Sequence, residues 1–141
     1  MNLIKDYKEI ALNRPRLFKK EYAEELLSVA YSDLETAKVL QAANLSRKEN
    51  ILFHTQQSIE KSLKAVICHH GLPVPMVHDL NELVKTVPNY EDVPYYNQLF
   101  DLTQFATIRR YEEGVVILTA EEVADAITVA SKICNWVKAQ L

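Results

Sequence analysis

Apolar residues recur along most of the chain at the three- and four-residue spacing of a helix that buries one face. This pattern predicts long helices over about residues 22–43, 46–70 and 119–141, with a further one beginning at Pro94. A short helix is predicted from Asp79 to just before Pro88. The last helix has the most regular apolar face, which consists of Val123, Ile127, Ala130, Cys134, Val137 and Leu141.

Several helix ends carry residues that satisfy free backbone groups. Ser46 and Glu49 have the spacing of a capping box at the start of the second predicted helix, and Thr119 and Glu122 have it at the start of the last. Gly71 follows the second helix where a left-handed residue commonly ends a helix. These signals agree with the helix limits that the apolar spacing predicts.

The helix predicted from residue 94 has an apolar row that ends in basic residues. The row itself consists of Tyr95, Leu99, Leu102 and Ala106. Arg109 is its next member, and Arg110 and Tyr111 follow directly. An arginine in a core-facing row is rarely buried alone. It reaches solvent at the end of the bundle, pairs with a carboxylate such as Asp33 or Glu60, or binds phosphate.

Each long helix has one apolar face that needs other helices to cover it. We therefore predict an all-α fold, an antiparallel bundle of four main helices plus a short one. The strand-like run over residues 115–118 has no partner strand, so we expect an extended connection packed on the core. Residues 22–141 form the predicted domain, and residues 1–21 form a basic N-terminal extension.

Composition excludes several classes of protein. Only two glycines occur in 141 residues, too few for a glycine-rich phosphate loop. The net charge of −3 combines a balance of +4 over residues 1–20 with −7 over the rest. An acidic body is a poor general surface for nucleic acid, so any such contact is local.

The chain has no sign of export or membrane insertion. No apolar stretch is long enough to span a membrane, and residues 1–10 lack the apolar core of a secretory signal. Cys68 and Cys134 lack CxxC spacing, so we expect both to be buried as small apolar side chains in a cytoplasmic protein.

Polar side chains interrupt the apolar pattern of the second predicted helix. Gln56 lies in line with apolar positions, and Gln57, Glu60, Lys61 and Lys64 share a neighbouring face. One interpretation is pairing of Glu60 with Lys64 on the helix surface. The other is a polar network between helices.

Histidines near the end of that helix suggest two kinds of site. Cys68, His69, His70 and His78 lie within eleven residues, but their spacing matches no zinc pattern, so no metal or other cofactor is expected. His78 stands at the start of the predicted short helix, where backbone amides can hold an anion. A capping-turn role for His78 is the structural alternative.

The segment over residues 53–65, FHTQQSIEKSLKA, resembles the FHxQQAxEKxLKA helix of HEPN domains, the higher eukaryote and prokaryote nucleotide-binding family. Three further motifs follow the family's order. Residues 33–37 resemble DLxxA, residues 78–80 resemble HDL, and residues 109–111 resemble RY(P). The resemblance covers about residues 22–140.

The resemblance implies a helical bundle that commonly forms a homodimer and is often encoded beside a minimal nucleotidyltransferase, in two-component or toxin–antitoxin modules. Many HEPN proteins are metal-independent ribonucleases with an Arg-x(4–6)-His motif near the end of the fourth helix. Here no histidine follows Arg109 and Arg110 in that window, so the imidazole for acid–base cleavage is missing. Arg47 and His54 have Arg-x6-His spacing but open the second helix, the wrong place.

We therefore expect a HEPN protein that binds a nucleotide or a nucleotidyltransferase partner and does not cleave RNA. The arginines and lysines hold phosphate in this hypothesis, and Tyr111 stacks on a base. The expected binding residues are Arg109, Arg110, Tyr111, His78, Gln57, Lys61 and Lys64. Two alternatives stay open: a ribonuclease toxin that uses His54 or His78 as its base, and a purely structural dimerisation module.

Overall fold

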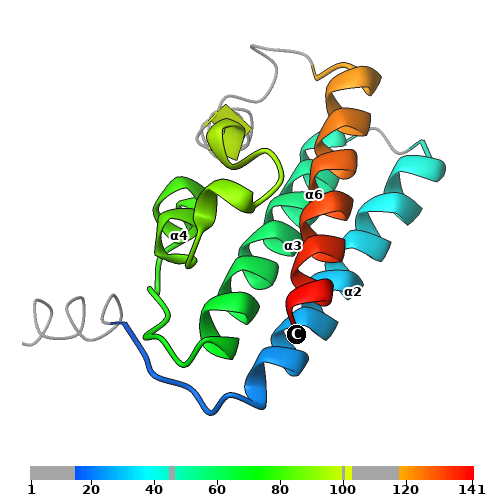
Figure 1. Cartoon of the computed structure of the whole chain (residues 1–141). Helices are drawn as coiled ribbons and strands as arrows, with labels where there is room; N and C mark the ends of the chain where they lie inside the picture. Colours follow the sequence, from blue (N-terminus) through cyan, green and yellow to red (C-terminus); the bar gives the residue numbers. More distant parts are fainter. Residues whose placement is uncertain (1–14, 45–46, 100, 103–117) are drawn as a thin grey trace, which may run out of the picture.

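Three long helices lie side by side in the computed structural model, which describes residues 15–44, 47–99, 101–102 and 118–141 (Figure 1). They are α2 (Tyr22–Ala42), α3 (Lys48–His69) and α6 (Ala120–Gln140). The short helix α4 (Leu80–Thr86) packs on α3, and two 3₁₀ turns, η1 (Tyr90–Asp92) and η2 (Tyr96–Gln98), pack on α4. The predicted all-α fold is confirmed.

Helix α3 is the centre of the described bundle, because it contacts α2, α4 and α6. Its first turn and that of α6 lie at one end, where Lys48 and Ala120 line a common hollow, and its last turn lies near Leu141 at the other. Helices α3 and α6 therefore run parallel, and α2 runs antiparallel to both (Figure 1). The predicted apolar faces form the core, with the row Leu27, Ala30, Leu34 and Ala37 of α2 buried.

Small side chains line the contact between the three long helices. The Ser58 hydroxyl donates to the Ala30 carbonyl over 2.8 Å, and the Ser62 hydroxyl donates to the Ser58 carbonyl over 2.9 Å. The Cys134 Sγ lies 3.2 Å from Ser58 Oγ and 3.0 Å from Ser62 Oγ. Burial raises the pKa of the Cys134 thiol. The expectation that Cys134 and Cys68 are buried is confirmed.

Three of the predicted helix ends are confirmed. Thr119 and Glu122 form a reciprocal capping box at the start of α6. The Asp79 carboxylate accepts from two backbone amides at the start of α4. Gly71 follows the end of α3 with φ +71°, a value that a residue with a Cβ adopts only with strain. The Gly71 amide donates to the Cys68 carbonyl and the Leu72 amide donates to the Ile67 carbonyl, and these two bonds form a Schellman motif.

Two predicted helix starts are wrong. Helix α3 begins at Lys48, with Arg47 at the N-cap, and Ser46 lies outside the described residues. The predicted first turn at Pro94 is replaced by 3₁₀ geometry, because Tyr95 has φ +59°, a left-handed conformation that no right-handed helix accepts. Helical backbone resumes at Leu99. Ala106 and residues 115–117 lie outside the described part.

The segment before α2 is attached to the far end of α3. Arg16 and Val74 form an isolated antiparallel bridge, with N–H···O distances of 3.0 and 2.8 Å. The Phe18 ring stacks on Tyr22 with centroids 5.2 Å apart. None of the described helices is long and apolar enough to cross a membrane.

The capping box makes a measurable contribution to stability. We expect Thr119→Ala to lower the free energy of unfolding by about 1 kcal/mol, because one amide at the start of α6 loses its acceptor. Urea denaturation measures the change. Thr128→Ala, an exposed position on the same helix, is the matched control and should change stability by less than about 0.5 kcal/mol. Equal losses in the two variants would contradict this role for Thr119.

Candidate functional site

A buried carboxylate gathers three of the predicted binding residues. Glu60 of α3 is 0% exposed. Its Oε2 accepts from the ammonium groups of Lys61 and Lys64, each at 3.3 Å, and its Oε1 lies 2.8 Å from Nδ1 of His78. His78 precedes α4, so the interaction joins two elements. The predicted pairing of Glu60 with Lys64 is present, but it is buried and not on the helix surface, and His78 extends it into a network that reaches beyond α3.

The charges around Glu60 do not cancel. Burial alone raises the pKa of its carboxyl group, but the Lys64 ammonium, the hydrogen bond with His78 and the Lys61 ammonium together bring the pKa below its ordinary value. Glu60 is therefore ionised at neutral pH. Two ammonium groups face one carboxylate, which leaves an excess of positive charge even when His78 is neutral.

Exposure increases from one side of this cluster to the other. The side chain of Lys64 is 8% exposed, that of Lys61 29% and that of His78 82%. Lys64 is therefore committed to neutralising Glu60 inside the bundle. Lys61 and His78 are the groups that a ligand in solvent reaches, so they form the outer face of the cluster.

Of the remaining predicted binding residues, the described part of the chain includes only Gln57. Gln57 is partly buried on α3, one helical turn before Lys61. Arg109, Arg110 and Tyr111 lie outside the described residues.

His54 belongs to a second pair of carboxylate and imidazole. Its Nδ1 lies 3.1 Å from Oδ1 of Asp33, which joins α3 to α2, and the two side chains are 31% and 22% exposed. His54 and Glu60 are six positions apart, which places them about 9 Å apart along the helix axis and on different faces. The two pairs are therefore separate sites.

Sequence patterns alone predicted neither the complete burial of Glu60 nor the pairing of Asp33 with His54. A signal was present for each, because Glu60 directly follows the buried Ile59 and Asp33 directly precedes the buried Leu34. An acid at the edge of an apolar row is often half-enclosed and then needs a basic partner.

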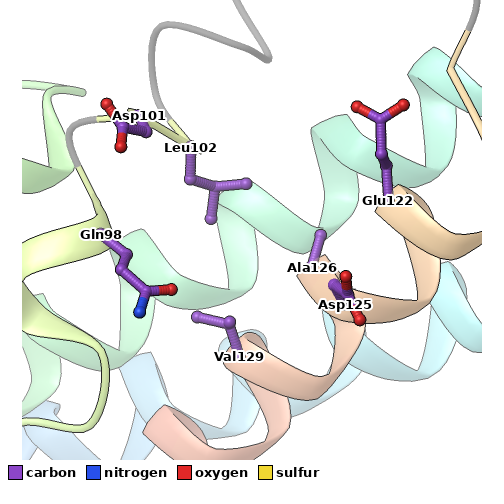
Figure 2. Close-up of a pocket in the computed structure, with 7 residues that line it drawn as sticks. All are labelled: Gln98, Asp101, Leu102, Glu122, Asp125, Ala126 and Val129. Atoms are coloured by element: carbon purple, nitrogen blue, oxygen red, sulfur yellow. The ribbon is translucent and has the colours of Figure 1, made fainter.

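A groove elsewhere on the bundle has the opposite charge. Its volume is about 380 Å³, and it lies between residues 98–102 and the first half of α6. Leu102 on one side and Ala126 and Val129 on the other face the same space, with carboxylates around them (Figure 2). The described lining includes Asp101, Glu122 and Asp125 and no basic residue. Such a lining repels phosphate, so this groove is a poorer anion site than the Glu60 cluster.

The other histidines do not form a metal site with their neighbours. The rings of His69 and His70 pack edge to face with centroids 5.6 Å apart. Across residues 15–44, 47–99, 101–102 and 118–141, no three His, Cys, Asp or Glu side chains are grouped to hold a metal ion.

Comparison with known families gives one result. The family model described as HEPN domain matches residues 23–140, which includes α2, α3, α4 and α6 almost entirely. No curated protein and no solved structure matched the chain.

The charge balance at Glu60 predicts how stability depends on pH. The pKa of Glu60 is lower in the folded protein than its ordinary value of 4.5, so its ionised form stabilises the fold above pH 4.5. That contribution is lost as the pH falls through the folded-state pKa. We expect Glu60→Gln to lower the free energy of unfolding by about 3 kcal/mol at neutral pH, because Lys64 then lacks its counter-charge.

Urea denaturation at neutral pH and at successively lower pH values below 4.5 tests this. The difference between the wild-type protein and Glu60→Gln should narrow as the wild-type carboxylate takes up a proton. Glu35→Gln, an exposed position on α2, is the control and should change stability little at any pH. A difference that stays constant with pH would contradict the pairing of an ionised Glu60.

Proposed function

This chain belongs to the HEPN domain family, and we propose that it binds a nucleotide through phosphate groups held at the outer face of the Glu60 cluster. The observation that carries the proposal is the convergence of Lys61, Lys64 and His78 on one buried carboxylate. The cluster keeps a positive charge that its own carboxylate does not cancel. Hydrogen bonds from charged donors are the strong ones in phosphate recognition.

The individual residues have different roles in this proposal. Lys61 and His78 contact the phosphate, and Lys64 supports them by neutralising Glu60. Gln57 adds a neutral donor one turn along α3. The residues Arg109, Arg110 and Tyr111 extend the site, with the guanidinium groups on phosphate and the tyrosine ring stacked on the base.

The proposed context follows from the family resemblance. We place the protein in the cytoplasm as a homodimer that functions with a minimal nucleotidyltransferase, in a two-component module of the toxin–antitoxin type. A nucleotide is the substrate of such an enzyme, so nucleotide binding and partner binding are compatible in one protein.

A second candidate function is RNA cleavage, which one observation favours. His54 and His78 each have a carboxylate at Nδ1, at 3.1 and 2.8 Å. A carboxylate at Nδ1 orients an imidazole and stabilises its protonated form, which is what a general base needs. Against this function stands the absence of histidine in the window after Arg109 and Arg110.

Isothermal calorimetry with ATP and GTP tests nucleotide binding. We expect heat of binding with the wild-type protein and about tenfold weaker affinity in Lys61→Ala, the loss of one charge-assisted hydrogen bond. Arg109→Ala should also weaken binding. Lys132→Ala removes an exposed lysine of α6 and should leave the affinity unchanged. Absence of heat in the wild-type protein with either nucleotide would reject the proposal.

Incubation with transfer RNA and messenger RNA tests the second candidate. We expect both RNAs to remain intact, as judged by gel electrophoresis. Cleavage by the wild-type protein that is lost in His54→Ala or His78→Ala, and kept in His70→Ala, would instead establish a ribonuclease. His70 is the control because it is exposed and lies at the far end of α3.

A further inference from the structure

The contact between His78 and Glu60 determines where the imidazole carries its proton. Nδ1 of His78 lies 2.8 Å from Oε1 of Glu60, and Oε2 of the same carboxylate accepts from Lys61 and Lys64. An ionised carboxylate has only acceptors, so Nδ1 must be the donor. The hydrogen bond therefore requires the form of His78 in which Nδ1 bears the hydrogen.

The other ring nitrogen is the one available to a ligand. The His78 side chain is 82% exposed, although Nδ1 is bound to a fully buried carboxylate. Nε2, on the opposite edge of the ring, therefore faces solvent. In neutral His78 it is an acceptor with a lone pair, and in the imidazolium it is a donor.

We propose that Glu60 is a positioning residue that holds a proton on Nδ1 of His78, so that the cluster binds a phosphate-type anion more tightly when Nε2 takes up a second proton. This inference rests on the proposed phosphate site. A phosphate oxygen is an acceptor, and it gains nothing from the lone pair of neutral Nε2. With Nε2 protonated, the same atom donates a charge-assisted hydrogen bond.

The surrounding charges are consistent with this proton coupling. Lys61 and Lys64 of α3 share the Glu60 carboxylate, and Asp79, beside His78 in the chain, has its carboxylate bound by the amides of Asn81 and Glu82. Of these groups, imidazole is the type that ordinarily titrates between about pH 5 and 8. Anion affinity should therefore be higher at low pH, where an imidazole is ordinarily protonated, than at high pH.

The proton position is tested without any ligand. Long-range nitrogen–proton NMR correlations of the wild-type protein at about pH 8.5, where an ordinary imidazole is neutral, report which ring nitrogen of His78 carries the hydrogen. We expect Nδ1. A hydrogen on Nε2 would overturn the positioning role. Glu60→Gln should reduce the preference for Nδ1, and the wild-type spectrum decides the question even if that variant does not fold.

The proton coupling is tested with inorganic sulfate, whose charge does not change across this pH range. We expect the wild-type affinity to fall as the pH rises from about 5 to 8, since a proton is bound together with the anion. His78→Gln should bind weakly at every pH, and His70→Gln should behave like the wild-type protein. An affinity that does not change with pH would overturn the coupling.

The two proposals fail in different ways. ATP binding in the wild-type protein that is independent of pH would leave the proposed function standing and reject the role of Nε2. Absence of both sulfate and ATP binding at every pH would reject the phosphate site, and the NMR result on Nδ1 would still decide whether Glu60 positions His78.

Discussion

The cost of burying one negative charge organises this protein. Glu60 is fully enclosed in the middle of α3, and a carboxylate in that position is tolerated only when it is paired and hydrogen-bonded. Lys64 and Lys61 supply charge from the same helix, and His78 supplies a hydrogen bond from the segment before α4. The pairing therefore holds the start of α4 against α3, and the helix packing and the charge of the site are linked.

The side chains of the Glu60 cluster contribute both to the stability of the fold and to the proposed binding site. Lys64, at 8% exposure, is used inside the bundle, whereas His78 reaches from a buried carboxylate to open solvent. What remains for a ligand is the positive charge that Glu60 does not neutralise. The acidic groove beside α6 (Figure 2) has the opposite sign, so this groove and the Glu60 cluster favour different ligands.

The main features of the fold were predictable because they depend on local spacing. Apolar periodicity located α2, α3 and α6, and the residue types at Asp79, Thr119 and Gly71 marked helix ends where backbone groups need partners. The helix start predicted at Pro94 was wrong, because the spacing of apolar residues does not report the backbone conformation of a single residue. Tyr95 adopts a left-handed φ, and the chain forms two short 3₁₀ turns in which the rings of Tyr90 and Tyr96 meet edge to face, 5.8 Å apart.

By itself the sequence determined the helical class, the family motifs and the residue types available for phosphate binding, since each is a property of nearby positions. Only the tertiary structure decided that Glu60 is buried and that His78, eighteen residues further on, binds it. A pair of Glu60 and Lys64 on the helix surface and the same pair in a buried network have the same spacing along α3. The two arrangements differ in whether another segment covers the carboxylate and excludes water from it, and that depends on how α4 packs against α3.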